Sequence, residues 1–459
     1  MINLCWLDIN ASYSHSSLAL PAIEANDTTG AINWRCVSGT TKSSIDDILS
    51  ELLSQPVDLL CATAWLFTHD YLLDLLKRFH QLSPDTIISL GGPEFLGDNY
   101  EYLKRHSFIR LIHKGDGEQT FFQWISIMDQ PARWHTVPGF CYIDEEGNYH
   151  DNGVASVSSF PQLRPPSHSS FFPFHKPFVQ FETSRGCYNT CAFCVSGEDN
   201  RIQSLSLEQI AEQLDLFVSR GIREIRLLDR TFNSSSQRAI DMLTLFESYH
   251  GRLSFHLEIH PALLTDALRS RIESLPVGLL HLEAGVQSLN EEVIRLVERK
   301  GSVVKTLEGL RFLCGLETME THVDLIAGLP QYTLAELFDD TCTLICLQAA
   351  EIQIELLKLL PGTRLRNNAR SLGIQFNPNP PYEVLSTHHI SPDELRKATR
   401  LSRIVDLFYN DSTFQSLFGQ MVNNESSDLL PRFVHEAVAQ GWFENPAPKE
   451  RSGELLTQY

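Results

Sequence analysis

The sequence has few basic residues and no long apolar run. Its 459 residues include 37 lysines and arginines against 57 aspartates and glutamates, which gives a formal net charge of −20 at pH 7. This charge disfavours broad contact with the phosphates of a nucleic acid. The apolar run at residues 59–67 is far too short to span a bilayer. We therefore expect neither a nucleic acid nor a membrane among the partners.

We also expect no secretory leader, and no repeats or low-complexity tracts are visible in the sequence. Residues 1–8 contain no basic segment followed by a long apolar one, so we expect a cytoplasmic protein. The ten cysteines would then lie in a reducing compartment, where disulfides do not persist. Metal binding or plain burial explains them better. The sequence has no P-loop, nucleophile elbow or HExxH motif, so it gives no sign of the enzyme classes that these motifs define.

Short apolar runs alternate with amphipathic segments through residue 138. This alternation predicts a parallel sheet covered by helices on both faces, which is a doubly wound domain over residues 1–138. The expected strands are residues 2–7, 32–37, 57–63, 86–90 and 109–113, and the expected helices are residues 17–25, 44–53, 68–82, 98–105 and 118–128.

A second series of strands and helices follows a predicted hairpin and linker at residues 139–175. Six strand-helix units over residues 176–363 predict a partial (β/α)6 barrel, in which chemistry collects at the C-terminal ends of the strands. Residues 364–459 are expected to form a mainly helical C-terminal domain, so the whole chain is of the α/β class. The expected barrel strands are residues 178–182, 224–228, 253–258, 279–283, 322–327 and 352–357.

Three cysteines follow directly after the first expected barrel strand, at Cys187, Cys191 and Cys194. Their C-x3-C-x2-C spacing lets three thiolates of one loop converge on an iron–sulfur cluster. Three protein ligands leave one iron open, and an open coordination site is what a catalytic metal needs. The alternative is a structural metal loop completed by a remote fourth cysteine.

The cysteine loop and the predicted barrel resemble the radical S-adenosylmethionine (SAM) superfamily over roughly residues 176–363. The resemblance implies a [4Fe–4S] cluster whose open iron chelates the amino and carboxylate groups of SAM. Reductive cleavage would then yield methionine and a 5′-deoxyadenosyl radical, which abstracts hydrogen from the substrate. It also implies that Phe193, the aromatic residue before the third cysteine, lies near the adenine.

Three further segments match the superfamily in order. Residues 228–233 resemble the end of its second strand, where polar groups meet the SAM amino group, and residues 281–288 resemble its fourth strand, whose carboxylate meets the ribose. Residues 326–330 resemble the fifth-strand segment that packs beside adenine, where glycine allows close approach. The alternatives are a polar turn at the strand end for the first segment, a structural ion pair of Glu283 for the second and an ordinary turn for the third. The SAM-binding residues that this resemblance implies are Asp229, Thr231, Glu283, Gln287, Ile326 and Gly328.

The first domain resembles that of the cobalamin-binding radical SAM class. The segments that match are Tyr13-Ser14-His15-Ser16-Ser17-Leu18, Gly91-Gly92-Pro93-Glu94 and Gly115-Asp116-Gly117-Glu118. Glycines at strand ends let a bulky ligand approach the backbone. The cobalamin contacts implied by the resemblance are therefore Gly91, Gly92, Gly115, Gly117 and Glu118.

One departure from the cobalamin domains is the missing Asp-x-His-x-x-Gly motif, which supplies an axial histidine in many of them. We therefore expect that any cobalt bound here lacks a protein imidazole below it. A doubly wound domain that binds no cofactor is the alternative. If cobalamin binds, the loops after residues 7, 63, 90 and 113 should form its cradle.

These features favour a cobalamin-dependent radical SAM enzyme, with methyl transfer as the candidate reaction. Its expected partners are a small-molecule or peptide substrate and an external one-electron reductant such as a flavodoxin or ferredoxin. The alternatives are a methylthiotransferase or other RNA-modifying radical SAM enzyme without cobalamin, and a non-catalytic iron–sulfur binding or sensing protein. Methylthiotransferases place three cysteines upstream of the barrel, but we interpret Cys5, Cys36 and Cys61 as buried small hydrophobic residues.

Overall fold

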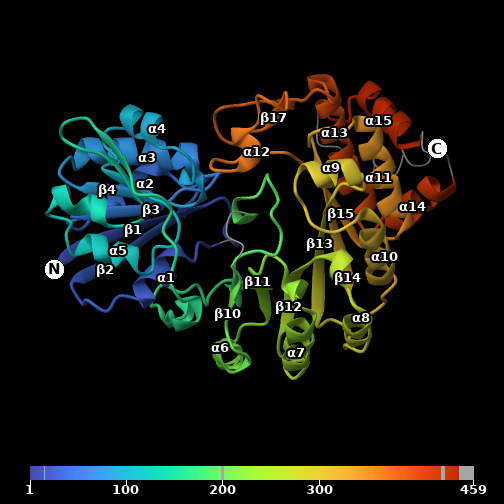
Figure 1. The fold of residues 1–459 in the computed structure, drawn as a ribbon, viewed down its shortest axis with the longest axis horizontal. Helices are drawn as coiled ribbons and strands as arrows, with labels where there is room; N and C mark the ends of the chain where they lie inside the picture. The colour runs from blue at the N-terminus through green and yellow to red at the C-terminus, as the bar shows by residue number, and fades with distance from the viewer. Residues whose placement is uncertain (15, 198–200, 425–428, 444–459) are drawn as a thin grey trace.

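The N-terminal part of the chain folds around a seven-stranded sheet in the computed structural model, which describes residues 1–14, 16–197, 201–424 and 429–443 (Figure 1). The strand order is β2-β1-β3-β4-β5-β6-β7, with the first five strands parallel and the last two joined as an antiparallel hairpin. The strands are β1 Ile2–Asn10, β2 Ile32–Thr40, β3 Leu59–Thr63, β4 Ile87–Gly91, β5 Leu111–His113, β6 Phe140–Ile143 and β7 Tyr149–Asp151.

Helices cover both faces of this sheet. On one face, Leu20 of α1 and Trp124 of α5 pack against Trp6 of β1. On the other face, Leu75 of α3 and Leu103 of α4 are buried in a second apolar cluster with the opposite side of the sheet. The 2-1-3-4-5 order with both faces covered is a doubly wound domain, as predicted. The helices are α1 Ala19–Ala25, α2 Ile45–Leu52, α3 His69–Leu82, α4 Tyr100–Arg105 and α5 Thr120–Ile125.

The second sheet has six parallel strands in the order β15-β14-β13-β12-β11-β8. Its first and last strands, β8 and β15, lie at opposite edges, so the sheet is an open, partial barrel. This confirms the predicted α/β architecture. The strands are β8 Val179–Phe181, β11 Glu224–Leu227, β12 Ser254–Ile259, β13 Leu280–Gln287, β14 Glu320–Ala327 and β15 Glu351–Leu356.

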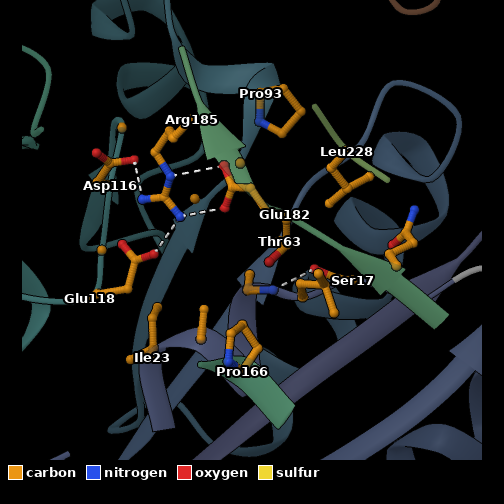
Figure 2. Close-up of a pocket in the computed structure, with 18 of the residues that line it drawn as sticks. Ser17, Ile23, Thr63, Pro93, Asp116, Glu118, Pro166, Glu182, Arg185 and Leu228 are labelled. Atoms are coloured by element: carbon orange, nitrogen blue, oxygen red, sulfur yellow. Dashed lines mark hydrogen bonds and ion pairs between the residues drawn. The ribbon is translucent and has the colours of Figure 1, made fainter. Parts of the chain in front are cut away.

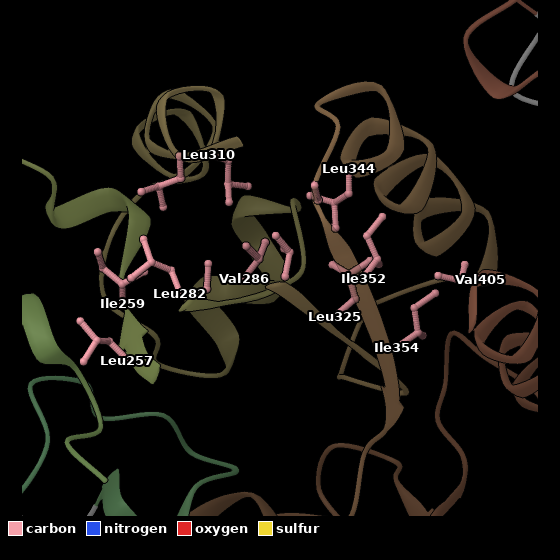
Figure 3. Packing of buried hydrophobic residues seen from close by; sticks show 14 of the residues in the cluster. Leu257, Ile259, Leu282, Val286, Leu310, Leu325, Leu344, Ile352, Ile354 and Val405 are labelled. Atoms are coloured by element: carbon pink, nitrogen blue, oxygen red, sulfur yellow. The ribbon is translucent and has the colours of Figure 1, made fainter. Parts of the chain in front are cut away.

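Alternation along the barrel strands separates an apolar core from a polar interior. In β13, Leu282 and Val286 are buried toward the helices, while Glu283 points to the opposite face of the sheet. Figure 3 shows Leu282 near Leu310 of α10 and Ile352 near Leu344 of α11. Burial of each such leucine contributes about 1.5–3 kcal/mol. The helices are α6 Leu207–Ser219, α7 Ser236–Glu247, α8 Asp266–Glu273, α9 Glu291–Leu296, α10 Val303–Cys314 and α11 Leu334–Cys346.

Helix α6 begins with a capping box formed by Ser206 and Gln209. The Ser206 side chain accepts a hydrogen bond from the Gln209 backbone N–H, and the Gln209 side chain accepts one from the Ser206 backbone N–H. This helix start determines where the chain, after leaving the cysteine loop, joins the outer helical layer of the barrel.

The C-terminal region is mainly helical and extends the barrel core. Phe408 and Phe433 belong to the same apolar cluster as Ile352 of β15, and α13, α14 and α15 each contact α11. Residues 425–428 and 444–459 of this region lie outside the described residues. The elements are α12 Arg364–Asn367, β16 Gln375–Phe376, β17 Val384–Ser386, α13 Pro392–Ile404, a π-helical turn Val405–Tyr409, α14 Gln415–Asn424 and α15 Leu429–Ala439.

No helix among the described residues is long and apolar enough to cross a membrane. The domain boundaries at residues 138, 175 and 363 stay predictions, because the β6-β7 hairpin joins the first sheet and the C-terminal helices share the barrel core.

Candidate functional site

A cavity of about 1350 Å³ lies between the two sheets. Loops that follow β1, β3, β4 and β5 form its wall on the first-domain side, and residues at the ends of β8 and β11 form the barrel side. Figure 2 shows Ser17, Thr63 and Pro93 from the first domain around the same space as Glu182 and Leu228 from the barrel. The carboxyl ends of strands from both sheets therefore meet at one cavity.

The five residues predicted to contact cobalamin, Gly91, Gly92, Gly115, Gly117 and Glu118, all line this cavity. Two of the glycines are also required by the chain itself. Gly92 and Gly115 have φ angles of +107° and +89°, and a Cβ atom would lie 2.6 Å from the Ala64 carbonyl oxygen at Gly92 and 2.1 Å from the Ala155 carbonyl oxygen at Gly115. Glycine is thus required at these two positions because neighbouring backbone atoms lie close to them.

The expected Tyr-Ser-His-Ser-Ser-Leu segment also reaches the cavity. Ser16, Ser17 and Leu18 line it, whereas His15 lies outside the described residues. Tyr13 is exposed, with the Lys176 ammonium group 3.7 Å from its ring centroid.

The cysteine loop begins two residues after the short strand β9, Ser184–Arg185, which pairs with β10, Gln203–Ser204. Cys187 and Cys191 are buried and Cys194 is half-buried, and none of the three is part of a disulfide. Burial raises the pKa of the Cys191 thiol, Arg299 opposes this shift, and the thiols of Cys194 and Cys187 add to it. Cys187 and Cys194 therefore both lie near Cys191.

The donor set fits a cluster better than a single ion. Among the residues that the structure describes, no three His, Cys, Asp or Glu side chains are grouped to hold one metal ion. A four-iron cubane spreads its thiolate ligands over several metal atoms, so they need not converge on one point. Three soft thiolates on one loop, beside a guanidinium group, suit an anionic iron–sulfur cluster.

Backbone contacts hold the cysteine loop on the barrel. The Ala192 N–H donates to the Val297 carbonyl at 2.8 Å, and the Ala192 carbonyl accepts from the Leu365 N–H at 2.8 Å. The Lys300 ammonium group donates to the Tyr188 carbonyl at 2.7 Å. The loop is thus fixed by the segment after α9 and by the start of α12.

Arg299 is a site residue that sequence reasoning missed. Its Nη1 lies 3.7 Å from the Cys191 sulfur, and its Nη2 donates to the Gly285 carbonyl in β13. Arg299 therefore joins the cysteine loop to the strand that carries Glu283 and Gln287. An arginine near a helix end has no sequence pattern that would have indicated this contact.

Asp229, a predicted SAM contact, is only 2% exposed and accepts four hydrogen bonds. Its Oδ1 accepts from the backbone N–H groups of Thr183 (2.7 Å) and Ser184 (3.0 Å), and its Oδ2 accepts from their hydroxyl groups at 2.5 and 2.7 Å. Both oxygens are therefore engaged by the segment that leads into the cysteine loop. The structure shows an anchor, and contact of Asp229 with SAM stays a prediction.

Thr231 and Phe193 lie close to the cysteine loop, as predicted contacts of SAM should. The Thr231 hydroxyl is 3.8 Å from the Cys187 sulfur and donates to the Arg230 carbonyl at 2.7 Å. Phe193, inside the loop, is half-buried against the barrel core. These placements are compatible with a ligand at the open side of the cluster.

The other predicted SAM contacts lie on β13 and after β14. Glu283 Oε2 is 2.9 Å from His256 Nε2, and this histidine lowers the pKa of the Glu283 carboxyl group. Gln287 and Gly328 have positive φ angles of 73° and 91°, where the two strands turn out of the sheet. Ile326 is partly buried against the core.

The barrel interior near Glu283 is polar and acidic. Burial raises the pKa of the Glu258 carboxyl group to about 7; Arg230 opposes the shift, and Glu283 and Asp324 add to it. Since the Glu258 side chain lies 3.5 Å from Arg230 at the cavity edge, this interior is continuous with the cavity wall.

Residues 181–341 match the radical SAM superfamily, and residues 370–456 match a protein family of unknown function (DUF4080). The first match shows that residues 181–341 form a radical SAM domain, the cofactors of which are a [4Fe–4S] cluster and SAM.

Two groups of curated relatives match at low identity. An uncharacterized methyltransferase, PH0819 of Pyrococcus horikoshii, is 24% identical over 211 residues, which cover 44% of this chain and 45% of the relative. A tRNA-2-methylthio-N(6)-dimethylallyladenosine synthase of Acidithiobacillus ferrooxidans is 25% identical over 276 residues, which cover 58% and 57%. The chain thus spans about half the length of these relatives.

Two solved structures share the fold over most of the chain. The radical SAM methyltransferase TsrM of Kitasatospora setae, solved with tryptophan and a SAM analogue, superposes with a TM-score of 0.64 at 15% identity, over 83% of this chain and 79% of TsrM. The cobalamin-dependent SAM radical enzyme OxsB, solved with aqua-cobalamin and SAM, gives a TM-score of 0.67 at 15% identity, over 96% and 71%. These likenesses show the fold.

Proposed function

We propose that this chain, an enzyme of the radical SAM superfamily, binds cobalamin in the cavity between its two sheets and transfers a methyl group to its substrate. The observation that carries the proposal is the cavity itself, because strand ends of the doubly wound domain and of the barrel line it together. Open α/β sheets bind ligands beyond the carboxyl ends of their strands, and radical SAM chemistry also lies at strand ends.

The size and lining of the cavity suit a bulky cofactor. Its volume of about 1350 Å³ exceeds the roughly 300–1,000 Å³ of ordinary small-molecule sites. Trp6, Trp65, Phe67 and Phe121 supply aromatic surface on the first-domain side. Cobalamin would carry the methyl group, and OxsB and TsrM are proteins of this fold that have been solved with cobalamin bound.

Residues on the first-domain side and on the barrel side of the cavity would bind different cofactors. The glycine turns at 91–92 and 115–117 would hold the corrin ring, and Cys187, Cys191 and Cys194 would hold the cluster, which together with SAM supplies the 5′-deoxyadenosyl radical. Phe193, Thr231, Glu283, Gln287, Ile326 and Gly328 are our candidates for contact with SAM.

His113 lines the cavity, but its geometry disfavours an axial role. Its Nε2 lies 2.8 Å from the Thr120 hydroxyl oxygen, and its ring packs edge-on against Phe140. We therefore keep the proposal that cobalt lacks a protein imidazole ligand.

A methylthiotransferase is less well supported, because its three upstream cysteines would have to converge on a second cluster. In the register of the sheet, Cys36 and Cys61 both pair with Trp6, so these two cysteines share one face. Cys5 packs into the apolar cluster on the opposite face. A sheet therefore separates the three thiols, and burial raises the pKa of each.

The proposal is tested by corrinoid retention in two matched variants. Phe67 is 62% exposed and lines the cavity, whereas Leu82 is 61% exposed at the end of α3 and does not line it. After anaerobic loading with hydroxocobalamin and removal of the free corrinoid, Phe67→Ala should retain less cobalt than the parent protein. Leu82→Ala should retain as much as the parent. Negligible cobalt in the parent, with its iron–sulfur cluster intact, would overturn the proposal.

A one-electron reductant must reach the cluster from outside, and we propose a flavodoxin or a ferredoxin for this role. The substrate is proposed to be a small molecule or a peptide, because the strongly negative net charge disfavours RNA.

A further inference from the structure

One guanidinium group, that of Arg185, connects the first domain with the segment that leads into the cysteine loop (Figure 2). Its Nη1 lies 3.1 Å from Asp116 and its Nη2 lies 2.9 Å from Glu118, both in the turn after β5. Its Nε and Nη2 also bind the two carboxylate oxygens of Glu182, at 3.0 and 2.8 Å. Three carboxylates from two domains thus converge on one side chain.

This contact is half-buried and suits arginine specifically. The Arg185 side chain is 22% exposed and that of Glu118 only 7%, and the Arg185 guanidinium group lies 4.8 Å from the centroid of the Phe160 ring. The planar fork of arginine can bind Glu182 with two donors and still reach two further carboxylates. The single ammonium group of a lysine has no comparable geometry.

The segment around Arg185 is held at both ends. Asp229 fixes Thr183 and Ser184 with four hydrogen bonds, and Cys187 follows two residues after Arg185. Between them, Gly186 has a φ of +98° and packs so closely on Arg201 that a Cβ atom would lie 2.3 Å from its carbonyl oxygen. A shift of the turn at residues 116–118 would therefore be transmitted through a few rigidly held residues to Cys187, the first cluster ligand.

We propose that Arg185 is a positioning residue that fixes the cysteine loop to the cavity wall at Asp116 and Glu118, so that the geometry of the cluster depends on the first domain. The proposal uses the cluster of the radical SAM domain and does not require bound cobalamin. Glu118, expected from the sequence to contact a corrin ring, then serves chiefly as the first-domain end of this connection.

The test compares Arg185→Met, Glu118→Gln and the double variant in full-length, cluster-loaded protein without corrinoid. We measure iron content, the electron paramagnetic resonance spectrum of the reduced cluster with and without SAM, and SAM cleavage with dithionite as reductant. Because the three cysteines remain, iron content should stay near that of the parent. The SAM-induced change in the spectrum should be altered in Arg185→Met, and kcat should fall about tenfold to a hundredfold, since small displacements at a reacting centre cost this much.

KM for SAM should change less than kcat, because the proposed SAM contacts on β13 and β14 are untouched. Glu118→Gln should show a weaker effect of the same kind. The double variant should resemble Arg185→Met, because both changes break one connection. Arg185→Lys should restore only part of kcat.

The matched control is Asp151→Asn. Asp151 binds the buried ammonium group of Lys114, just before the same turn, at 2.7 Å, and neither residue contacts the cysteine loop. This control should leave the spectrum and kcat unchanged even if it lowers stability. Parent-like spectra and kinetics in Arg185→Met, or additive effects of the two single changes, would overturn the proposal. If Arg185→Met does not fold, a parent-like spectrum in folded Glu118→Gln would overturn it equally.

Discussion

Replacing Asp229 by alanine should release the cysteine loop from the barrel. The carboxylate is almost completely buried, and it binds two backbone N–H groups and two hydroxyl groups of Thr183 and Ser184. Alanine leaves the two N–H groups without partners, and each such buried group costs about 1–3 kcal/mol. The hydroxyl groups can rotate toward other acceptors, so we expect a total loss of about 3–5 kcal/mol.

Asp229→Asn separates this anchoring role from contact with SAM. The asparagine carbonyl can still accept from both N–H groups, and its NH2 group can donate to the two hydroxyl oxygens once they turn. If Asp229 acts as an anchor, this variant should keep its iron and its KM for SAM. If the negative charge itself binds the SAM amino group, KM should rise although the iron is retained.

Iron retention is the assay, measured after gel filtration and as the rate at which a ferrous chelator strips the cluster under anaerobic conditions. Asp340→Ala is the matched control, because Asp340 is also a buried carboxylate that binds Leu289 and Tyr332 on the far side of the barrel. Both alanine variants should unfold at lower denaturant concentration, but only Asp229→Ala should lose iron faster. Equal iron loss in the two variants, or parent-like retention in Asp229→Ala, would refute the anchoring role.

Further predictions follow from single residues. Cys187→Ala, Cys191→Ala and Cys194→Ala should each abolish the four-iron cluster in iron and absorbance measurements, whereas Cys346→Ala, at an exposed thiol, should leave it intact. Burial raises the pKa of the Glu258 carboxyl group from 4.5 to about 7. The contribution of this group to stability is therefore present below pH 4.5 and is lost as the pH rises through about 7. Glu258→Gln should flatten the pH dependence of the unfolding free energy over this interval, as measured by urea titration. Tyr382→Phe removes the hydroxyl that donates to buried Glu94 and should cost about 1–3 kcal/mol; an unchanged denaturation midpoint would contradict this.

Much of the fold could be predicted from the sequence, because local patterns determine it. The alternation in residues 1–138 predicts all five parallel strands of the first sheet, and the six barrel strands lie where their apolar runs indicate. The capping box at Ser206 and Gln209 is equally local. The cysteine loop likewise follows the first barrel strand, with only the two-residue strand β9 between them.

The polar contacts of the site could not be predicted in this way, because they join residues far apart in the chain. Nothing near Arg185 in the sequence indicates that Asp116 and Glu118 of the first domain bind it. Asp229 looked like a ligand contact because it ends a strand, but its partners lie 45 and 46 residues earlier. At Gly92 and Gly115, glycine is explained by backbone packing that becomes visible only when the loops are placed together.

Anaerobic reconstitution of the purified chain with iron, sulfide and hydroxocobalamin allows the most direct measurement. Iron, cobalt and 5′-deoxyadenosine are determined in one sample after the free cofactors are removed and SAM and dithionite are added. We expect about four iron atoms per chain, stoichiometric cobalt and SAM cleavage that depends on Cys187, Cys191 and Cys194. A sample that holds iron and cleaves SAM but retains no cobalt would contradict cobalamin binding in the cavity, and a sample that holds no cluster would contradict the assignment of the three cysteines.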